Sequence, residues 1–575
     1  MKLQSFLGFA PFALCSPLNQ TWDYIIVGSG AAGIPLADRL SESGKSVLLI
    51  ERGFPSSGRW GGAWKPAWLE GTNLTRFDVP ALAQLVWSTN FDNTGIRCDD
   101  VVDVTASCVL GGGPAINAGQ FYLPTPGDFD LNQPLGFRYA DVQTAIRKAA
   151  SRLPWTDTPS SDGKLYLTNA TQIAIDALTN TSLTDPFRFI RANDELDDRN
   201  RTSSLFEFFF SNGEKGGPMA TYLVTADRRE KFRLQMNTTV TRILRKWNIA
   251  TGVQVEETYP GGLNGEIHVT PGTGRVILSA GVFGTFKILL RSGIGPADEL
   301  AQLSNHTTES KHLPKRKDWI ELPVRYNLDD TPSITLAVSL PYLEIYDWEG
   351  LYNSTPEQRP EISQYLRDRS GPLSILQPSS GPISFEEIVG EDNKKRIVQW
   401  DVTSAGGMGI IDGGFIGFSA NLDLGKTSRG RLTLLTQNTT SPFVKVSIPP
   451  YFNDPGDHDF KAILTSATNV LSIIQNIPSA SVFYPPPGVP LEAYLRQAIA
   501  TSGPALTRNH WVGSTKMGAS CEDEGAVVDI STRVCGMQNL HVVDAGIVNG
   551  VPTANPQAVI IVVAEKAAEI ILGLD

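Results

Sequence analysis

The strongest hydrophobic pattern in the chain lies close to the N-terminus. Residues 24–27 (YIIV) and 47–50 (VLLI) are uninterrupted apolar runs, which are typical of strands buried on both faces. Residues 31–43 between them repeat apolar side chains at the spacing of a helix, and residues 28–33 are a glycine-rich turn. The pattern predicts a strand, a tight turn, a helix and a second strand, which together make a βαβ unit.

Two further regions carry strand patterns. Residues 231–257 predict three short strands and residues 274–281 a fourth, and we expect these strands to return to one sheet. Between residues 313 and 450, runs such as SITLAVSL and GFIGFSANL alternate apolar and polar positions. This alternation predicts a separate lobe built on an antiparallel sheet with one solvated face.

The remaining segments read as loops and helices. Residues 54–122 are rich in Gly, Pro and Trp and lack a period, which indicates extended loops, whereas residues 124–200 are more helical in pattern. Short strands are expected within residues 526–544. Residues 555–572 predict a C-terminal helix that begins at an Asn–Pro pair.

Length and composition describe a large globular protein. The chain has 575 residues, too many for one hydrophobic core, and 41% of them are hydrophobic. Its formal net charge of −11 opposes binding to nucleic acid or to an anionic membrane. Beyond the N-terminus no apolar run approaches the ~18 residues of a membrane-spanning helix, so we predict no membrane span.

The N-terminus predicts export. Residues 1–17 carry one early Lys, an apolar stretch and then small residues, which fits a signal peptide, with a disordered leader as the alternative. Nine acceptor sites for N-glycosylation follow, where chance would give roughly four. These features favour a secreted, extracellular glycoprotein. The acceptor sites are Asn19, Asn73, Asn169, Asn180, Asn200, Asn237, Asn305, Asn353 and Asn438.

The cysteines agree with an oxidising compartment. Once Cys15 is removed with the leader, an even number remains, which predicts disulfides in an exported chain. Three pairings are open, and the simplest has two local bridges, Cys98–Cys108 and Cys521–Cys535. Neither the cysteines nor the histidines have the spacing of metal ligands, so we expect no metal site.

The glycine turn of the βαβ unit has the spacing of a dinucleotide site. Gly28 permits the turn, Gly30 lets the backbone approach a pyrophosphate, and Gly33 allows the helix to pack closely on the strand. Glu51 ends the second strand and is expected to bind a ribose hydroxyl, which favours FAD or NAD over NADP. The predicted contacts in this unit are Gly28, Ser29, Gly30, Ala31, Ala32, Gly33, Glu51 and Arg52.

Motifs along nearly the whole chain resemble those of the glucose–methanol–choline (GMC) oxidoreductases, a family of FAD-dependent alcohol and sugar oxidases and dehydrogenases. Within the family, these motifs, GGPMATYLV at 216–224 and GRW at 58–60 are most similar to the flavin domain of fungal cellobiose dehydrogenases. Pro114 and Phe286 depart from the family pattern, in which a small residue and a Pro are usual. The motifs are GSGAAG at 28–33, SCVLGGGPAINAGQFYLP at 107–124, SAGVFGTFKILLRSGIGP at 279–296, NHWVGSTKMG at 509–518 and VVDAGIVNGVPTANPQA at 542–558.

The resemblance implies an α/β fold of the GMC type. It has a Rossmann-like FAD-binding domain and a substrate domain built on an antiparallel sheet with helices. We expect the discontinuous FAD-binding domain at residues 18–60, 225–312 and 505–575. Residues 61–224 and 313–504 are then the flavin-covering loops and the substrate-binding domain.

The resemblance also implies FAD as the cofactor and extends the expected contacts with it. Asp544 is expected near the pyrophosphate and ribityl chain, although an Asp there can also simply cap the following turn. Some relatives tether the flavin through a His in the N-terminal half, but the first His of this chain is His268, so we expect noncovalent FAD. The further cofactor residues are Gly112, Gly113, Asn117, Ala118, Val240, Asp544, Ala545 and Pro556.

His510 and Asn555 match the catalytic pair of the family. A neutral imidazole is suited to take a hydroxyl proton while the neighbouring C–H bond gives up its hydride, and Asn555 would hold the hydroxyl. The alternative is a structural His with a helix-capping Asn. The other five histidines are expected at the surface or in packing.

These features predict a secreted FAD-dependent dehydrogenase that oxidises a carbohydrate hydroxyl, C1 of a glucose-based sugar, to the lactone. Electrons would pass to a quinone, a radical or a redox protein, because we expect no haem domain ahead of Trp22. Trp60, Trp64 and Trp68 would either stack on sugar faces or pack internally. The alternatives are an aryl- or aliphatic-alcohol oxidase that produces peroxide, and a catalytically idle flavin protein. Nothing in the sequence fixes the oligomeric state.

Overall fold

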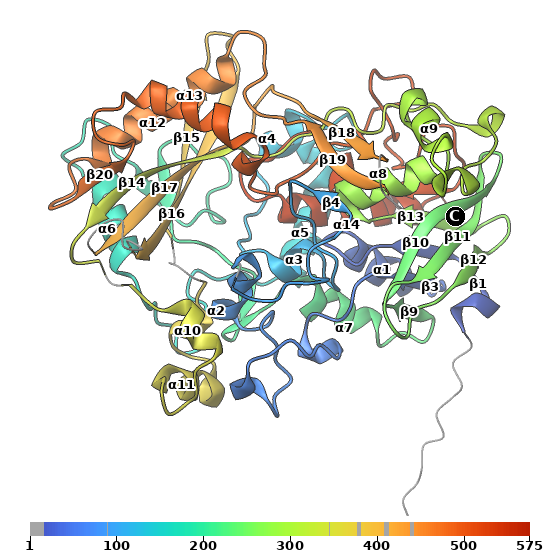
Figure 1. The fold of residues 1–575 in the computed structure, drawn as a ribbon, viewed down its shortest axis with the longest axis horizontal. Helices are drawn as coiled ribbons and strands as arrows, with labels where there is room; N and C mark the ends of the chain where they lie inside the picture. The colour runs from blue at the N-terminus through green and yellow to red at the C-terminus, as the bar shows by residue number, and fades with distance from the viewer. Residues whose placement is uncertain are drawn as a thin grey trace, which may run out of the picture.

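The computed structural model describes residues 16–88, 90–343, 345–376, 381–406, 413–436 and 442–574. Residues 1–15 of the predicted signal peptide and the glycosylation acceptor Asn438 lie outside the described residues. The rest is arranged around two large sheets, with the parallel sheet on the right of Figure 1 and the antiparallel sheet on its left.

A five-stranded parallel sheet contains the predicted βαβ unit. Strands β2 (Tyr24–Val27) and β3 (Val47–Ile50) pair in parallel, every residue in both is buried, and α1 (Gly33–Glu42) connects them. The strand order is β21 (Leu540–Val542), β13 (Arg275–Leu278), β2, β3 and β9 (Phe232–Gln235). Segments from the start, middle and end of the chain therefore meet in one sheet.

A separate four-stranded sheet holds two of the four strands that we expected in one sheet. Its order is β1 (Thr21–Trp22), β12 (Gly265–Val269), β11 (Ile249–Glu257) and β10 (Thr238–Lys246). The expectation of one sheet is wrong for β10 and β11, because these neighbours pair with each other as an antiparallel hairpin. A short connection permits that pairing, whereas a parallel pair needs a long crossover.

A seven-stranded, mostly antiparallel sheet forms the predicted second lobe. The bounds of β14 (Ser333–Leu340) and β17 (Gly414–Leu422) coincide with the two alternating runs. All residues of β17 except Phe415 are buried, because β17 lies between β14 and β16 and contacts α12 (His458–Ile474). The expected solvated face is therefore wrong for this strand. The sheet order is β20 (Ser481–Tyr484), β14, β17, β16 (Lys395–Gly406), β15 (Ile383–Val389), β6 (Thr202–Ser204) and β5 (Arg188–Phe189).

The C-terminal helix α14 (Gln557–Leu572) packs against α1 and α5 (Tyr139–Arg152). Glu565 is buried on α14 and accepts two hydrogen bonds from the Arg39 guanidinium, at 2.8 and 2.9 Å. Tyr222 donates a third at 2.6 Å. This contact ties the last helix to the first. Removing one partner of such a buried ion pair would leave an uncompensated charge, which is destabilising.

Smaller elements complete the fold, and none of the helices in the described ranges is long and apolar enough to cross a membrane. The small sheets comprise β18 (Arg431–Leu435), β19 (Phe443–Ile448) and β4 (Val101–Val102), and β7 (Phe210–Ser211) with β8 (Glu214–Lys215). The other helices are α2 (Pro80–Ala83), α3 (Gly113–Ile116), α4 (Pro126–Asp130), α6 (Asn169–Leu178), α7 (Tyr222–Ala226), α8 (Gly281–Arg291), α9 (Ala297–Ser304), α10 (Trp348–Tyr352), α11 (Pro360–Asp368) and α13 (Leu491–Ser502).

Both predicted disulfides are confirmed. Cys98 is bonded to Cys108 and Cys521 to Cys535. Cys15 lies outside the described residues.

Candidate active site

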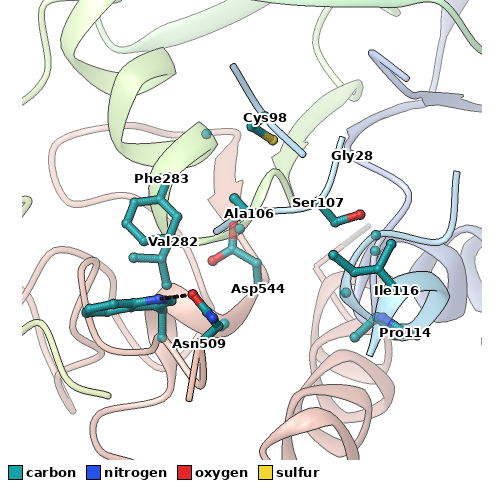
Figure 2. Close-up of a pocket in the computed structure, with 18 of the residues that line it drawn as sticks. Gly28, Cys98, Ala106, Ser107, Pro114, Ile116, Val282, Phe283, Asn509 and Asp544 are labelled. Carbon is teal, nitrogen blue, oxygen red and sulfur yellow. Dashed lines mark hydrogen bonds between the residues drawn. The ribbon is translucent and has the colours of Figure 1, made fainter. Parts of the chain in front are cut away.

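A cavity of about 640 Å³ lies at the carboxyl ends of the parallel strands, where ligands bind in open α/β sheets. Figure 2 shows its walls: Val282 and Phe283 of α8 lie on one side, Pro114 and Ile116 of α3 on the other, and Asp544 between them. Every residue of the predicted site except Gly33 lines this cavity.

The glycine turn is shaped by two close contacts and one open position. Gly28 has φ +101°, and a Cβ there would lie 2.4 Å from the Ser279 carbonyl oxygen. A Cβ at Gly33 would lie 1.9 Å from the Gly28 carbonyl oxygen, so Gly33 permits close packing of α1 on β2. Gly30 has no heavy atom within 4 Å of its Cβ position and faces the cavity. This open position, next to the N-terminal end of α1, fits a pyrophosphate.

Glu51 holds the glycine turn in place. Its carboxylate accepts hydrogen bonds from the Ser29 backbone N–H at 3.0 Å and from the Ser29 hydroxyl at 2.6 Å. The Gly53 N–H donates to its other oxygen at 2.9 Å. The side chain still lines the cavity, so its contact with a ribose hydroxyl stays a prediction.

Arg52 takes part in a charged cluster on the same wall. Its guanidinium and the Lys287 ammonium each lie 3.0 Å from an oxygen of Asp100. Although burial opposes the shift, these two cations lower the pKa of Asp100 to about 2. All three side chains line the cavity.

The second glycine-rich loop touches the first. A Cβ at Gly112 would lie 2.7 Å from the Gly30 Cα, whereas nothing lies within 4 Å of that position at Gly113. Asn117 donates from Nδ2 to Gln557 Oε1 at 3.0 Å and accepts from the Gly119 N–H at 2.9 Å. The loop is thus tied to the start of α14, and Gly113 leaves room for a ligand.

Asp544 caps a turn, and its expected contact with the cofactor stays a prediction. The carboxylate accepts from the Gly546 N–H at 2.8 Å, which caps the following turn, and from the Thr285 hydroxyl at 2.6 Å. It also lines the cavity, and burial raises its pKa to about 6. Val240 lines the cavity from β10.

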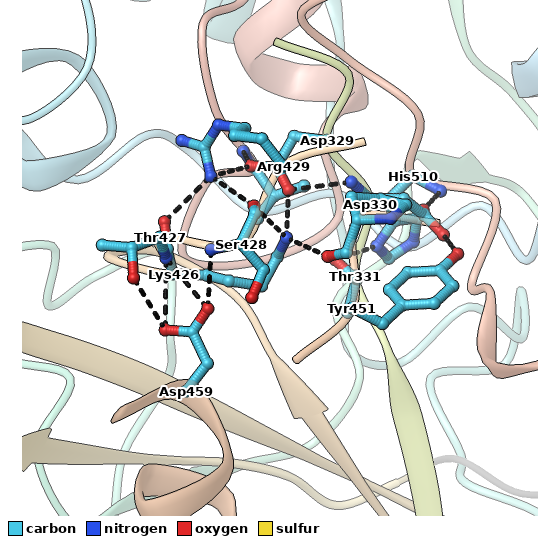
Figure 3. Close-up of polar contacts among 12 residues, drawn as sticks. Asp329, Asp330, Thr331, Lys426, Thr427, Ser428, Arg429, Tyr451, Asp459 and His510 are labelled. Atoms are coloured by element: carbon cyan, nitrogen blue, oxygen red, sulfur yellow. Dashed lines mark hydrogen bonds and ion pairs between the residues drawn. The ribbon is translucent and has the colours of Figure 1, made fainter. Parts of the chain in front are cut away.

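His510 lies at one end of the cavity within a polar network, drawn in Figure 3. Its Nε2 lies 3.2 Å from Asn555 Nδ2, its Nδ1 lies 3.2 Å from Thr331 Oγ1, and its backbone N–H donates to Asp330 at 2.5 Å. Burial, and then the charge of Arg508, lower the pKa of His510 to about 3. The imidazole is therefore neutral at physiological pH.

Asn555 leaves one acceptor free. Its Oδ1 is buried and has no hydrogen-bond partner among the described residues. Buried polar atoms are normally paired, so a free acceptor beside His510 is suited to a polar group of a bound molecule.

The wall next to His510 is polar on one part and apolar on another. Arg508 donates to Asp401 at 3.1 Å and to Asn421 at 2.8 Å. Phe206 and Leu376 add apolar surface to the same cavity. The wall can thus donate and accept hydrogen bonds beside an apolar contact.

The three tryptophans considered as sugar platforms do not line the cavity. Trp68 is buried and donates to the Leu351 carbonyl at 3.2 Å. Trp64 stacks on Phe54 with ring centroids 5.6 Å apart, and Trp60 packs against the main core. All three tryptophans therefore pack internally, which was the alternative considered from sequence.

Several residues of the site were not found from sequence. Arg508 and Gln557 lie within two positions of the predicted pair, so proximity to the motifs was a usable signal. Thr331 and Asp330 lie in a segment without a motif.

Lys215 contacts the second glycine-rich loop and also lies outside any motif. Its buried ammonium group donates to the carbonyls of Ala115 and Asn117, and burial lowers the pKa of Lys215 to about 7.

Family models for the GMC oxidoreductases match residues 22–332 and 426–564. The chain belongs to this family, and it is an FAD-dependent oxidoreductase that acts on CH–OH groups. The expected fold class and the expected FAD cofactor are both confirmed. The site fits FAD: it has open positions at Gly30 and Gly113 and a free acceptor on Asn555.

The chain is similar over nearly its full length to curated relatives of the family. It is 26% identical to an oxygen-dependent choline dehydrogenase of Vibrio vulnificus and 27% identical to the dehydrogenase eriK of Hericium erinaceus. Each alignment covers 96% of this chain and 95% of the relative.

Solved structures share the fold at low identity. A formate oxidase variant of Aspergillus oryzae superposes with a TM-score of 0.73 at 18% identity, covering 96% of this chain and 98% of the other. A fungal aryl-alcohol oxidase gives 0.67 at 18% identity, covering 96% and 99%.

Proposed function

We propose that this chain oxidises a carbohydrate hydroxyl, C1 of a glucose-based mono- or oligosaccharide, to the lactone. The observation that carries the proposal is the polar wall of Arg508 and Asp401 beside the His510–Asn555 pair. A sugar presents several hydroxyls at short spacing, and a site that selects it needs charged donors and acceptors close to the reacting group. We also propose that the motifs are most similar to those of cellobiose dehydrogenase flavin domains, which would agree with this class.

The step that we assign to the protein's own side chains is removal of the hydroxyl proton of the substrate. The neutral Nε2 of His510 accepts the hydroxyl proton, which becomes favourable as negative charge develops on the substrate oxygen next to it. Asn555 holds that hydroxyl through its free Oδ1 or its Nδ2 group. When bound, FAD supplies the acceptor for the hydride.

We assign FAD binding to the residues that line the cavity away from His510, and Gly33 supports them from behind. FAD is held without a covalent bond, since the first His follows at position 268 and Cys98 and Cys108 are bonded to each other. Precipitation with acid should release all of the flavin into solution. Flavin that stays with the protein would contradict this assignment.

Export follows as part of the proposal. Six of the nine glycosylation acceptors are exposed: Asn19, Asn73, Asn180, Asn200, Asn305 and Asn353. Expression in a secreting fungal host should give a protein whose mass falls on treatment with an endoglycosidase. Unchanged mass, or retention in the cytosol, would contradict it.

The test of substrate class is anaerobic reduction of the bound flavin. We expect cellobiose, lactose or glucose to bleach the absorption near ~450 nm, and we expect His510→Ala to lose that bleaching while it retains FAD. A benzylic alcohol is the comparison substrate, because Phe206 and Leu376 would suit its ring. Bleaching by the benzylic alcohol alone would overturn the carbohydrate proposal, as would bleaching by none of the four.

The electron acceptor is tested with the sugar that bleaches the flavin. We propose a quinone, a radical or a redox protein as acceptor. Turnover with benzoquinone and little peroxide in air is the expected result. Rapid peroxide formation in air would identify an oxidase instead.

A further inference from the structure

A buried chain of hydrogen bonds leads from the catalytic imidazole into the protein. Nδ1 of His510 lies 3.2 Å from the hydroxyl oxygen of Thr331, and that hydroxyl donates to Asp423 Oδ1 at 2.5 Å. Thr331 and Asp423 have exposed fractions of 0% and 1%, so water does not compete for these bonds. Figure 3 shows Thr331 next to His510.

Backbone contacts hold the segment of Thr331 against the segment of His510. Arg508 N–H donates to the Thr331 carbonyl at 3.1 Å, and Asp329 and Val512 exchange two backbone hydrogen bonds of 3.0 Å. Asp423 follows directly on β17, which lies between β14 and β16 in the antiparallel sheet. The distance from the imidazole to the carboxyl group is therefore set by rigid elements.

The direction of the hydrogen bonds decides where the imidazole proton lies. A threonine hydroxyl has one hydrogen, and here it goes to the Asp423 carboxylate. Toward His510 the hydroxyl can then only accept, so Nδ1 must carry the proton. Nε2 is left with a lone pair, which accepts from the Asn555 amide in this structure and would accept from a substrate hydroxyl that displaces that amide.

We propose that Asp423, acting through Thr331, is a positioning residue that holds His510 in the Nδ1–H tautomer, with Nε2 free to accept the proton of the substrate. This inference rests on the proposed role of His510 as the base. Neither Thr331 nor Asp423 touches the cavity.

The hydrogen bonds from His510 through Thr331 to Asp423 can also reverse their direction. Asp423 Oδ2 has no hydrogen-bond partner among the described residues, and burial raises the pKa of Asp423 well above its usual range. The charged groups that face it are Asp330, Asp401 and Arg508, with Lys426 already in an ion pair. A protonated Asp423 would donate to Thr331, whose hydroxyl would then donate to Nδ1 and leave the proton of the imidazole on Nε2. Acid should therefore convert His510 to the tautomer that cannot accept.

The test reads the tautomer directly. The FAD-loaded protein without substrate is labelled with ¹⁵N-histidine, and the His510 resonances are assigned by their loss in His510→Ala. We expect Nδ1–H at pH 8.5 and growth of the Nε2–H form on acidification. Thr331→Val removes the hydroxyl at nearly constant shape and should give mixed tautomers and at least ~100-fold slower flavin reduction, since a wrong tautomer is costly in the serine-protease triad too.

Three further variants separate positioning from packing. Thr331→Ser keeps the hydroxyl and should restore the Nδ1–H form and most of the rate. Asp423→Asn cannot ionise, so the tautomer ratio should no longer change with pH and the rate should fall ~10-fold or more. Thr335→Val removes a hydroxyl from the neighbouring strand β14, where it pairs with Ser419 at 2.9 Å, and should change neither readout.

An Nε2–H tautomer in the wild-type protein at pH 8.5 would overturn the inference. So would wild-type tautomer and rate in Thr331→Val, or an unaltered pH response in Asp423→Asn. Because the tautomer is measured without substrate, failure of the carbohydrate proposal would leave this result readable.

Discussion

Asn555 lies with its Nδ2 atom 3.2 Å from Nε2 of His510, although 45 positions separate the two residues in the chain. The contact joins the loop before α14 to the segment 507–512, which bridges to residues 329–332 ahead of β14. It gives the imidazole a fixed orientation at the end of the cavity, and it leaves Oδ1 of Asn555 without a partner among the described atoms.

This contact predicts that Asn555→Leu abolishes most of the activity without loss of the cofactor. The variant removes both groups that would hold the substrate hydroxyl, and misplacement of a reacting group by about 1 Å costs ~100-fold in rate. Stopped-flow measurement of flavin reduction should show a fall of about 100-fold or more, with the flavin content of the purified protein unchanged. A rate within threefold of wild type would show that Asn555 does not orient the substrate.

The glycine turn predicts two different defects from two similar substitutions. Gly33→Ala would force a Cβ to within 1.9 Å of the Gly28 carbonyl oxygen, so α1 cannot keep its place on β2 and the thermal midpoint should fall steeply. Gly30→Ala meets no protein atom within 4 Å, so the apoprotein should unfold near the wild-type temperature. Its methyl group would instead occupy the space in the cavity, and flavin content should fall.

The comparison is made on apoproteins by thermal unfolding and on purified proteins by the ratio of flavin to protein absorbance. Equal stability losses in both glycine variants would contradict the distinction. Full flavin content in Gly30→Ala would show that this position does not approach the pyrophosphate.

The parts of the fold that were predictable carry their cause in the local sequence. β2, β3, β14 and β17 have the bounds of their hydrophobic runs, because burial on one or both faces leaves a direct trace in the pattern. The sheet to which β10 belongs left no such trace. Its choice depends on the pairing partner, and the nearest partner in the chain, β11, formed the hairpin.

The residues of the candidate site divide in the same way, into those that the local sequence reveals and those that it does not. The glycine turn, His510 and Asn555 are visible because their spacing or motif is local. Thr331 and Asp423 are not, since 179 residues separate Thr331 from His510 and 92 separate it from Asp423. A single buried hydroxyl or carboxylate in a strand-flanking loop looks like any other polar residue until the fold brings its partner near.

The two disulfides enclose loops of similar length, with sequence separations of 10 and 14. In the chain-entropy model each stabilises the fold by about 3 kcal/mol. Only Cys98 and Cys108 line the cavity. We expect the double variants Cys98→Ser/Cys108→Ser and Cys521→Ser/Cys535→Ser to lose similar thermal stability, and only the first to lose flavin as well. Equal flavin content in both would mean that the first bridge does not shape the site.

Burial of Glu207 makes the stability of the protein depend on pH. The carboxylate has an exposed fraction of 0% and accepts from the Asn193 N–H at 3.0 Å. Burial raises its pKa to about 7, against roughly 4.3 in an unfolded chain. Between these values the folded protein holds a proton that the unfolded chain releases. The stability that comes from this group is thus complete below about pH 4 and is lost as pH rises through 7, by roughly 4 kcal/mol.

Glu207→Gln is uncharged at every pH and removes this dependence. We therefore expect the wild-type protein to be the more stable of the two at pH 4.5 by a margin that shrinks, or changes sign, at pH 8. Thermal midpoints at pH 4.5, 6 and 8 measure the margin, and Glu230→Gln, at an exposed position, controls for the change in net charge. A margin between wild type and Glu207→Gln that is constant across this range would show that Glu207 is ionised in the folded protein throughout. In that case the hydrogen bonds from Asn193 and Ser204, and not burial, would control the titration of the carboxyl group.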